Sequence, residues 1–262
     1  MYIDLQWWQV ALATLLMLIN AGLSVALKLG LEKSLLIASV RTVVQLFLIG
    51  LVLEWVFQVE RWYVVVLLGC LMTGIAGWTA AGRSRRKIAG VKFDCLVSIW
   101  VSSWLVTGFA LFCVLQGNEK WYQPQYAVPL LGMVLGNILN GITLGLNSLT
   151  ESLTSRRDQV ESLLALGATR WEAAREPIVE AMKTGMTPII NAMMIVGLVS
   201  LPGMMTGQLV SGMEPMHAVK YQIVIMFLIA SATAMGTAGV VLLAFVRLFN
   251  RDHQFFHQKM SE

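Results

Sequence analysis

Residues 62–81 read W-Y-V-V-V-L-L-G-C-L-M-T-G-I-A-G-W-T-A-A, and residues 82–87 directly after them read G-R-S-R-R-K. The first stretch holds no charged residue and has the length of about 20 residues that a helix needs to cross a bilayer. The second stretch is a basic island of the kind that stays on the cytoplasmic side of a membrane. Together they predict a membrane-spanning helix followed by a cytoplasmic loop.

The same alternation of apolar runs and charged islands continues along the whole chain. The 262 residues are 57% hydrophobic and 13% charged, whereas about 25% of the residues in a soluble domain are charged. Because a lipid-exposed backbone must satisfy its own hydrogen bonds, we predict an all-α polytopic membrane protein with a single membrane domain over 1–262. About seven spans are expected, at 7–27, 34–56, 62–81, 95–115, 127–147, 185–205 and 221–246. The sixth contains Pro188 and Pro202 and is expected to be broken or kinked.

The positive charges predict the orientation of these spans. Of the 19 Lys and Arg residues, all but Arg61, Lys120 and Lys220 lie in, or close to, one set of alternating loops. The positive-inside rule therefore places the N-terminus outside and the C-terminus in the cytoplasm. This topology explains the formal net charge of +4, so the charge does not indicate a nucleic-acid partner.

One sizeable polar segment, 148–184, falls on the cytoplasmic side. Within it, V-E-S-L-L-A-L-G-A-T-R-W-E-A-A-R-E-P-I at 160–178 spaces its apolar residues as one face of a helix. A helix lying on the lipid surface is one interpretation. The nearly equal numbers of acidic and basic residues favour a protein partner instead, because helices that bind lipid surfaces are usually basic.

The residues inside this segment predict how it is divided. Gly167 is a candidate for the end of a first helix. Thr169, followed three residues later by Glu172, forms a capping box that starts a second helix. Pro177 is expected to kink or end that second helix. We therefore predict a helix, a tight turn and a short helix on the cytoplasmic face.

No motif in the sequence indicates an enzyme. The chain has no Gly-Lys dipeptide and therefore no phosphate-binding loop of the Walker type. We expect no cofactor in this chain. The interiors of the spans hold no carboxylate, which argues against a self-contained proton-coupled carrier, while sodium or backbone-based coupling stays open. Glu32 and Asp94, at cytoplasmic span ends, are the acids at which we predict that a metal would enter.

The spans do contain neutral polar and sulfur-containing side chains. Asn137 and Asn140 lie in the fifth span and Asn191 in the sixth. Such residues either hold helices together or line a wet pathway, and the sequence leaves both interpretations open. Met204 and Met205 are candidates for binding a soft metal, although methionine also fills gaps between helices.

The second span contains an arginine well inside its apolar run. Arg41 lies about 10 Å along the axis from the predicted cytoplasmic end, and Gln45, four residues on, shares its face. An arginine at this depth costs a few kcal/mol unless it reaches the headgroups or finds a partner. Arg41 therefore either extends to the inner membrane surface or lines a cytoplasmic vestibule with Gln45.

The sequence resembles known transport proteins both in one segment and over its whole length, and these resemblances imply a function. The segment E-S-L-L-A-L-G-A-T at 161–169 resembles the cytoplasmic EAA loop of ABC-transporter permeases, with Glu161 and Gly167 at the spacing of that motif. Ser162 and Leu163 replace its two alanines. The whole chain resembles the FetB family of iron-export permeases, which is similar to plant aluminium-tolerance permeases. The stretches behind this are S-V-R-T-V-V-Q-L at 39–46, P-L-L-G-M-V-L-G-N at 129–137, 161–169, and S-L-P-G-M-M-T-G-Q at 200–208.

This resemblance implies a permease subunit in a bacterial inner membrane. Such a subunit would act as a homodimer with a separate ABC ATPase, which binds ATP and Mg, and would export iron. The alternatives are export of an anionic organic substrate such as a nucleotide sugar, or a self-contained secondary carrier. The coupling residues implied for the ATPase contact are Glu161, Gly167, Ala168, Thr169, Arg170, Glu172 and Arg175.

Overall fold

The computed structural model describes residues 6–84, 87–114, 122–250, 252–256 and 260–261. Arg85, Arg86 and the expected outer loop around Lys120 lie outside these residues. The helices are α1 (Trp7–Ala26), α2 (Glu32–Val59), α3 (Trp62–Gly82), α4 (Val91–Phe109) with a π-helical turn at Ala110–Val114, α5 (Pro124–Ser155), α6 (Arg157–Ala165), α7 (Arg170–Ile195), α8 (Gly203–Val210) and α9 (Pro215–Leu248). Two short strands, β1 (Lys87–Ile88) and β2 (Met260–Ser261), pair antiparallel. The prediction of an all-helical membrane protein is confirmed.

Six of the described helices are long and apolar enough to cross a membrane: α1, α2, α3, α4 with its π-helical turn, α5 and α9. The sixth expected range, 185–205, falls on the end of α7, an irregular link and the start of α8. The break lies at 196–202, a stretch that ends at Pro202, and not at Pro188. That this broken segment crosses the membrane stays a prediction.

The helix after Thr169 is longer than predicted. We expected a short helix that Pro177 would kink or end. Helix α7 is 26 residues long and continues through both Pro177 and Pro188. A proline inside a helix removes one backbone hydrogen bond, yet tertiary packing outweighs such local costs when the face is buried. Pro177 and the adjacent Ile178 are buried, so the second coupling helix and the first half of the sixth expected span, up to Ile195, are parts of one helix.

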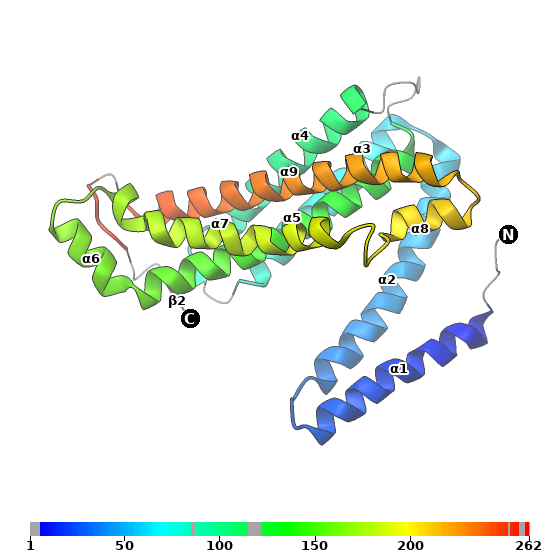
Figure 1. Ribbon diagram of the computed structural model, residues 1–262, viewed down its shortest axis with the longest axis horizontal. Helices are drawn as coiled ribbons and strands as arrows, with labels where there is room; N and C mark the ends of the chain where they lie inside the picture. Colours follow the sequence, from blue (N-terminus) through cyan, green and yellow to red (C-terminus); the bar gives the residue numbers. More distant parts are fainter. Residues whose placement is uncertain (1–5, 85–86, 115–121, 251, 257–259, 262) are drawn as a thin grey trace.

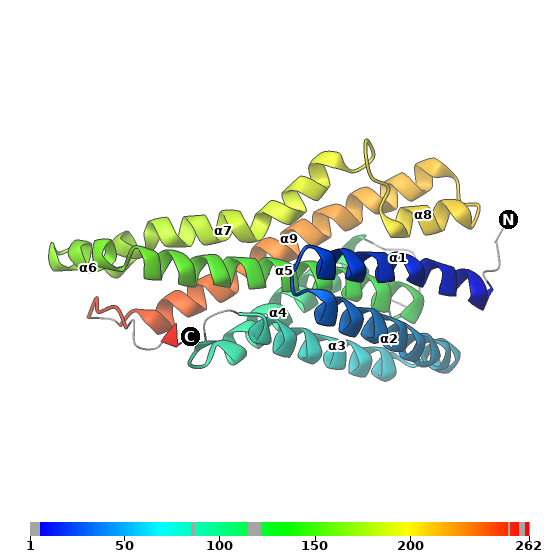
Figure 2. The ribbon, with the colours of Figure 1, turned by 90° about the horizontal axis from the view of Figure 1, so that it is seen from below.

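The molecule has two parts of different character. Helices α3, α4, α5, α7 and α9 form an elongated bundle, in which α5, α7 and α9 lie side by side (Figures 1 and 2). Helices α1 and α2 form a hairpin that diverges from this bundle (Figure 1). The hairpin touches the bundle near the end of α2, where buried Val56 packs in a small cluster with Val64, Val65, Ala127 and Val128.

Glycines allow the bundle helices to approach one another. A Cβ atom at Gly185 of α7 would lie 2.8 Å from the carbonyl oxygen of Gly141 in α5 and 2.6 Å from Cγ2 of Thr237 in α9. A Cβ atom at Gly145 would lie 2.8 Å from the same Thr237 methyl carbon. Small residues at crossing points are the usual means by which membrane helices pack closely. The three helices therefore cross at their glycines.

Helix length decides how far the bundle extends beyond the membrane. Helices α5 and α9 have 32 and 34 residues, which corresponds to about 50 Å each. A hydrocarbon core of about 30 Å leaves about 20 Å of each helix outside it. The last turns of α5, beyond its expected span, together with α6 and the start of α7 at the same end (Figure 1), form a polar stalk, which the predicted topology places in the cytoplasm.

Candidate coupling and transport sites

The turn between α6 and α7 is closed at both ends by hydrogen bonds. Gly167 has a φ of +91°; its N–H donates to the Leu164 carbonyl, and the N–H of Ala168 donates to the Leu163 carbonyl. This pair of bonds is a Schellman motif, which favours glycine at the left-handed position. The predicted helix end at Gly167 is confirmed.

The predicted capping box at the start of α7 is confirmed as well. The Thr169 hydroxyl oxygen accepts from the N–H of Glu172 at 3.3 Å, and the Glu172 carboxylate accepts from the Thr169 N–H at 2.8 Å. The backbone N–H of Thr169, and then its hydroxyl, which donates at 2.7 Å, hold the pKa of Glu172 below its usual range. The turn is therefore rigidly specified by its own residues.

This turn presents an apolar side chain to the surroundings. Leu166 is 85% exposed, and nothing lies within 4 Å of the position where Gly167 would carry a Cβ atom. The turn and α6 form the end of the molecule that lies farthest from α8 in both views (Figures 1 and 2). Leu166 is therefore accessible to a partner protein at the tip of a capped, protruding turn.

The charged residues predicted for coupling surround the turn. Glu161 accepts a hydrogen bond from Nε of Arg157 at 2.7 Å. The guanidinium of Arg170 lies 5.7 Å from the ring centre of Phe245, and Arg175 is exposed on α7. The structure therefore brings Glu161, Gly167, Ala168, Thr169, Arg170 and Glu172 to one end of the molecule, with Arg175 about one turn further along α7.

A clamp between α5 and α7 supports this end and was not predicted. Arg156, at the end of α5, pairs with Glu176 at 2.9 Å and with Glu180 at 3.3 Å. The Ser152 hydroxyl donates to the same Glu180 carboxylate at 3.0 Å. Glu176 and Glu180 are four residues apart and so lie on one face of the helix, a pattern that indicates pairing with a basic side chain. The identity of that side chain depends on the antiparallel packing of α5 and α7, which no local pattern encodes.

Above the clamp, α5 and α7 share an exposed polar face. The contacts Ser148–Thr184 and Ser152–Glu180 set an antiparallel register that places Asn140 and Asn191 within about one helical turn of the same level. Both asparagines are exposed. Within the described residues, Asn140 makes no side-chain hydrogen bond to another helix, and Asn137 donates to its own helix at the Met133 carbonyl. These contacts do not match a role for Asn137 or Asn140 in joining helices.

Lys183 and Thr187 extend this polar face along α7 toward the stalk, and both are exposed. The Thr187 hydroxyl donates to the Lys183 carbonyl at 2.7 Å. Polar side chains at membrane depth seldom face lipid and usually face protein or a water-filled cavity. The face is therefore suited to lining a pathway, against either water or a second copy of the chain.

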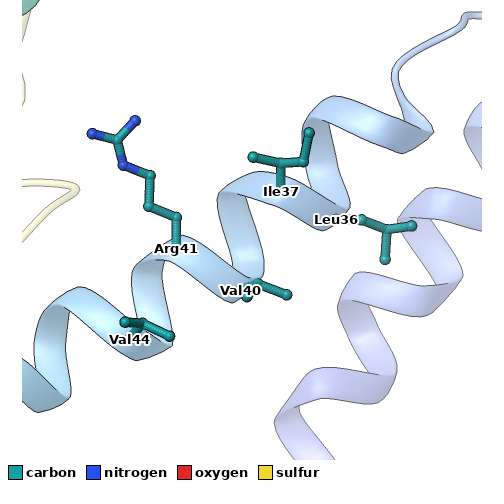
Figure 3. A pocket seen from close by; sticks show the side chains of 5 residues that line it. All are labelled: Leu36, Ile37, Val40, Arg41 and Val44. Carbon is teal, nitrogen blue, oxygen red and sulfur yellow. The ribbon is translucent and has the colours of Figure 1, made fainter.

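Arg41 lies on the hairpin and not on the bundle. Figure 3 shows its side chain extending away from α2 beyond a shallow apolar surface formed by Leu36, Ile37, Val40 and Val44. Arg41 and Gln45 are both exposed, and no ion pair involves either residue within the described part of the chain. The structure therefore keeps both interpretations of Arg41 open.

The two predicted acids have different surroundings. Glu32 starts α2 and accepts a hydrogen bond from Ser24 at 3.2 Å, which ties the ends of α1 and α2 together. Asp94 is only 3% exposed, and both of its carboxylate oxygens accept from Arg247, at 2.7 and 2.6 Å. A carboxylate that is buried and engaged in this way fastens α4 to α9, a role that the sequence analysis missed because the partner lies 153 residues away.

Side chains that could bind a metal occupy several positions in the described part of the chain. Among the described residues, no group of three or more His, Cys, Asp or Glu side chains could hold a metal ion. Met204 and Met205 are partly exposed on α8, and Met204 packs against the main core and lines a small gap with Pro129 and Tyr221. Packing of this kind matches the gap-filling alternative for Met204.

Comparison with known proteins relates this architecture to a family. The model of the uncharacterised protein family UPF0014 matches residues 7–249. A UPF0014 membrane protein of Synechocystis is 35% identical over 86% of this chain and 87% of its own. The probable iron export permease protein FetB of Escherichia coli is 31% identical over 93% and 92%. Protein ALUMINUM SENSITIVE 3 of Arabidopsis thaliana is 30% identical over 93% and 88%.

No solved structure matches the chain, so its relationships rest on sequence. The family match covers nearly all described helices, from α1 to the end of α9. One of these relatives is named as a permease, and six of the described helices of this chain are long and apolar enough to cross a membrane. The chain belongs to the UPF0014 family of membrane proteins.

Proposed function

We propose that this chain is the permease subunit of an ABC exporter that moves iron out of the cytoplasm of a bacterium across its inner membrane. Two copies would form the pathway, and two copies of a separate ATPase, which binds ATP and Mg, would drive it. The iron substrate rests on the printed name of the Escherichia coli relative. The ABC partnership rests on the turn between α6 and α7.

That turn is the single observation that carries the proposal. A subunit without its own ATP site must receive force from another protein, and force can be received only at a surface that is both accessible and rigid. The turn is accessible because Leu166 is 85% exposed. It is rigid because a Schellman motif closes one side and a capping box the other. Helix α7 then leads directly from the turn to the polar face with Lys183 and Asn191.

Assembly with the ATPase tests the turn. The permease would be co-expressed with a candidate ABC ATPase subunit from the same genome and purified through a tag on the permease. Leu166→Glu should reduce ATPase recovery by tenfold or more, because a charged group would replace the apolar contact. Leu29→Glu is the matched control, since Leu29 is exposed in the connection between α1 and α2 on the same predicted side. Equal recovery with Leu166→Glu and wild type would contradict the proposal.

Substrate stimulation tests the cargo. In proteoliposomes containing the complex, Fe²⁺ should raise the rate of ATP hydrolysis, and iron should move in the direction away from the ATPase face. A complex that assembles and hydrolyses ATP but ignores Fe²⁺ would retain the ABC partnership and exclude iron. Transport without any ATPase would support a secondary carrier instead.

One observation favours a second candidate, an anionic organic substrate such as a nucleotide sugar. Along the polar face, the charged group nearest to Asn140 and Asn191 is a cation, Lys183, and Arg41 supplies another on the hairpin. A pathway with these charges attracts anions and repels a bare metal ion. Stimulation of ATP hydrolysis by a nucleotide sugar, and not by Fe²⁺, would favour this candidate.

A further inference from the structure

The first turn of α7 donates a further hydrogen bond to a distant part of the chain. The first four N–H groups of a helix have no partner inside the helix. Thr169 satisfies that of Glu172, and the N–H of Arg170 donates to Nδ1 of His253 at 2.9 Å. His253 is 83 residues away in sequence. The start of the coupling helix is therefore capped partly by the C-terminal tail.

The C-terminal tail, defined here by its described residues Phe249, Asn250 and 252–256, is folded back on itself. Phe249 and Phe255 are paired by an isolated bridge, and their rings stack with centres 4.9 Å apart. The N–H of Phe256 donates to the Leu248 carbonyl at 2.9 Å. His253 lies at the bend with a φ of +58°, the left-handed region that only a few residue types adopt readily.

Aromatic contacts attach the tail to α9 and α7. Phe249 is buried and lies 5.2 Å from Phe245, measured between ring centres. Phe245 in turn meets Trp171 of α7 edge-on at 5.6 Å. Such aromatic pairs contribute beyond the area that they bury. The tail, the end of α9 and the start of α7 therefore form one packed cluster.

The same cluster reaches α4. Arg247, in the last turn of α9, holds buried Asp94 in the first turn of α4. Further along the chain, β2 pairs with β1, which lies just before α4. The α6–α7 turn is thus connected through the tail and the aromatic cluster to α9, and through Arg247 to α4.

We propose that His253 is a positioning residue for the coupling turn: by capping Arg170 it makes the α6–α7 turn move as one body with α9. The structural part of this proposal needs only this chain, whereas its consequence for transport rests on the proposed function. Without the cap, the turn would still bind a partner through Leu166, but its movement would be transmitted less completely to the spans.

The backbone conformation of His253 allows a matched pair of variants. His253→Asn keeps an acceptor, because Oδ1 of asparagine is the same number of bonds from the backbone as Nδ1 of histidine. His253→Gly removes the acceptor. Both residues adopt positive φ readily, so the two variants differ in the hydrogen bond and not in backbone strain.

Amide hydrogen exchange in the purified full-length protein is the direct test. Loss of one hydrogen bond should speed exchange at the Arg170 amide by about three- to tenfold in His253→Gly. His253→Asn should exchange at the wild-type rate. Equal rates in His253→Gly and wild type, or equally fast exchange in both variants, would overturn the proposal. This measurement requires neither iron nor the ATPase.

Coupling is then measured in proteoliposomes that contain the complex with its ATPase. The number of Fe²⁺ ions exported for each ATP hydrolysed should fall severalfold in His253→Gly while the ATPase stays bound, and His253→Asn should restore it. A structural role alone would lower both rates together and leave their ratio unchanged. If Fe²⁺ fails to stimulate the wild type, the proposed cargo is wrong, and the exchange experiment still decides the role of His253.

Discussion

The α1–α2 hairpin and the α5–α7–α9 core are both built of apolar helices, yet they pack very differently. In the most apolar window of α2 no residue is buried, whereas half of the residues in the corresponding windows of α5 and α9 are buried. Hydropathy does not separate them, because α2 is the more apolar. Apolar character determines that a helix enters the membrane, and small residues determine which helices then pack together.

The glycines show this difference directly. In the core, Gly141, Gly145 and Gly185 each have backbone or side-chain atoms of a neighbouring helix within about 3 Å of a would-be Cβ atom. In the hairpin, Gly22 and Gly50 have nothing within 4 Å. The hairpin surface is therefore left to lipid or to another protein chain.

The largest expected effect comes from filling one of the core crossings. Gly185→Ala places a methyl group against the Gly141 carbonyl and the Thr237 methyl group, and overpacking of this kind costs about 1–3 kcal/mol. Gly50→Ala in α2 is the control and should be neutral or slightly stabilising, because alanine favours helix more than glycine does. Thermal unfolding in detergent measures both. A loss for Gly50→Ala as large as for Gly185→Ala would mean that α2 is tightly packed in the folded protein.

The next effect concerns the two acids that the sequence analysis treated alike. Asp94→Asn removes the charge that holds Arg247, and we expect it to lower the free energy of unfolding by about 2 kcal/mol. Breaking a fully buried ion pair would cost more, but Arg247 is partly exposed. Glu32→Gln should cost less than about 0.5 kcal/mol, because its bond to Ser24 is only part-buried. Chemical unfolding of both variants makes the comparison.

Transport assays on the same two variants separate structure from pathway. If Asp94→Asn unfolds at wild-type denaturant concentrations yet requires more iron for export, Asp94 belongs to the pathway and its pairing with Arg247 is not its main role. If Glu32→Gln alone changes the iron requirement, the hairpin takes part in transport although it packs so loosely.

Sequence patterns predicted the membrane character, the helical class, the capped turn at 166–169 and the family, because each depends on local composition or spacing. The register of α5 against α7, the pairing of Asp94 with Arg247 and the capping of Arg170 by His253 depend on contacts across many residues and were not predictable. Pro177 shows the limit of a local rule. The rule predicted a kink or an end, and the end is excluded because α7, which is buried against the bundle there, continues through Pro177.

A smaller effect on transport is expected from substitutions of Arg41. These variants test whether the hairpin faces only lipid. Arg41→Lys should leave the amount of protein in the membrane unchanged, because lysine also reaches the headgroups. If Arg41 lines a vestibule, transport should fall by a few fold, since lysine lacks the planar set of donors. Arg41→Gln, which removes the charge, should lower transport at least as far. Full transport by Arg41→Lys would assign the residue to the lipid surface.

The smallest effect is expected at the start of α7. This part of the helix lies outside both the hairpin and the core, and its stability depends more on charge than on packing. The pKa of Glu172 is lowered from its ordinary value of 4.5, first by the Thr169 N–H and then by the Thr169 hydroxyl. Because the folded pKa is the lower one, the capping box contributes its full stability above pH 4.5, and this contribution is lost as the pH falls through the lowered pKa.

Thr169→Ala should therefore raise the pKa of Glu172 toward its ordinary value without fully restoring it, because the backbone donor stays. A carbon-13 NMR titration of the Glu172 carboxyl measures the change. Thr187→Ala, on the same helix but about five turns beyond Thr169, is the control and should leave the titration unchanged. A Glu172 pKa that is the same in Thr169→Ala as in the wild type would mean that the hydroxyl bond is absent in solution. The rigidity of the turn would then depend on the Gly167 motif, on the bond from the Thr169 N–H to Glu172 and on the His253 cap.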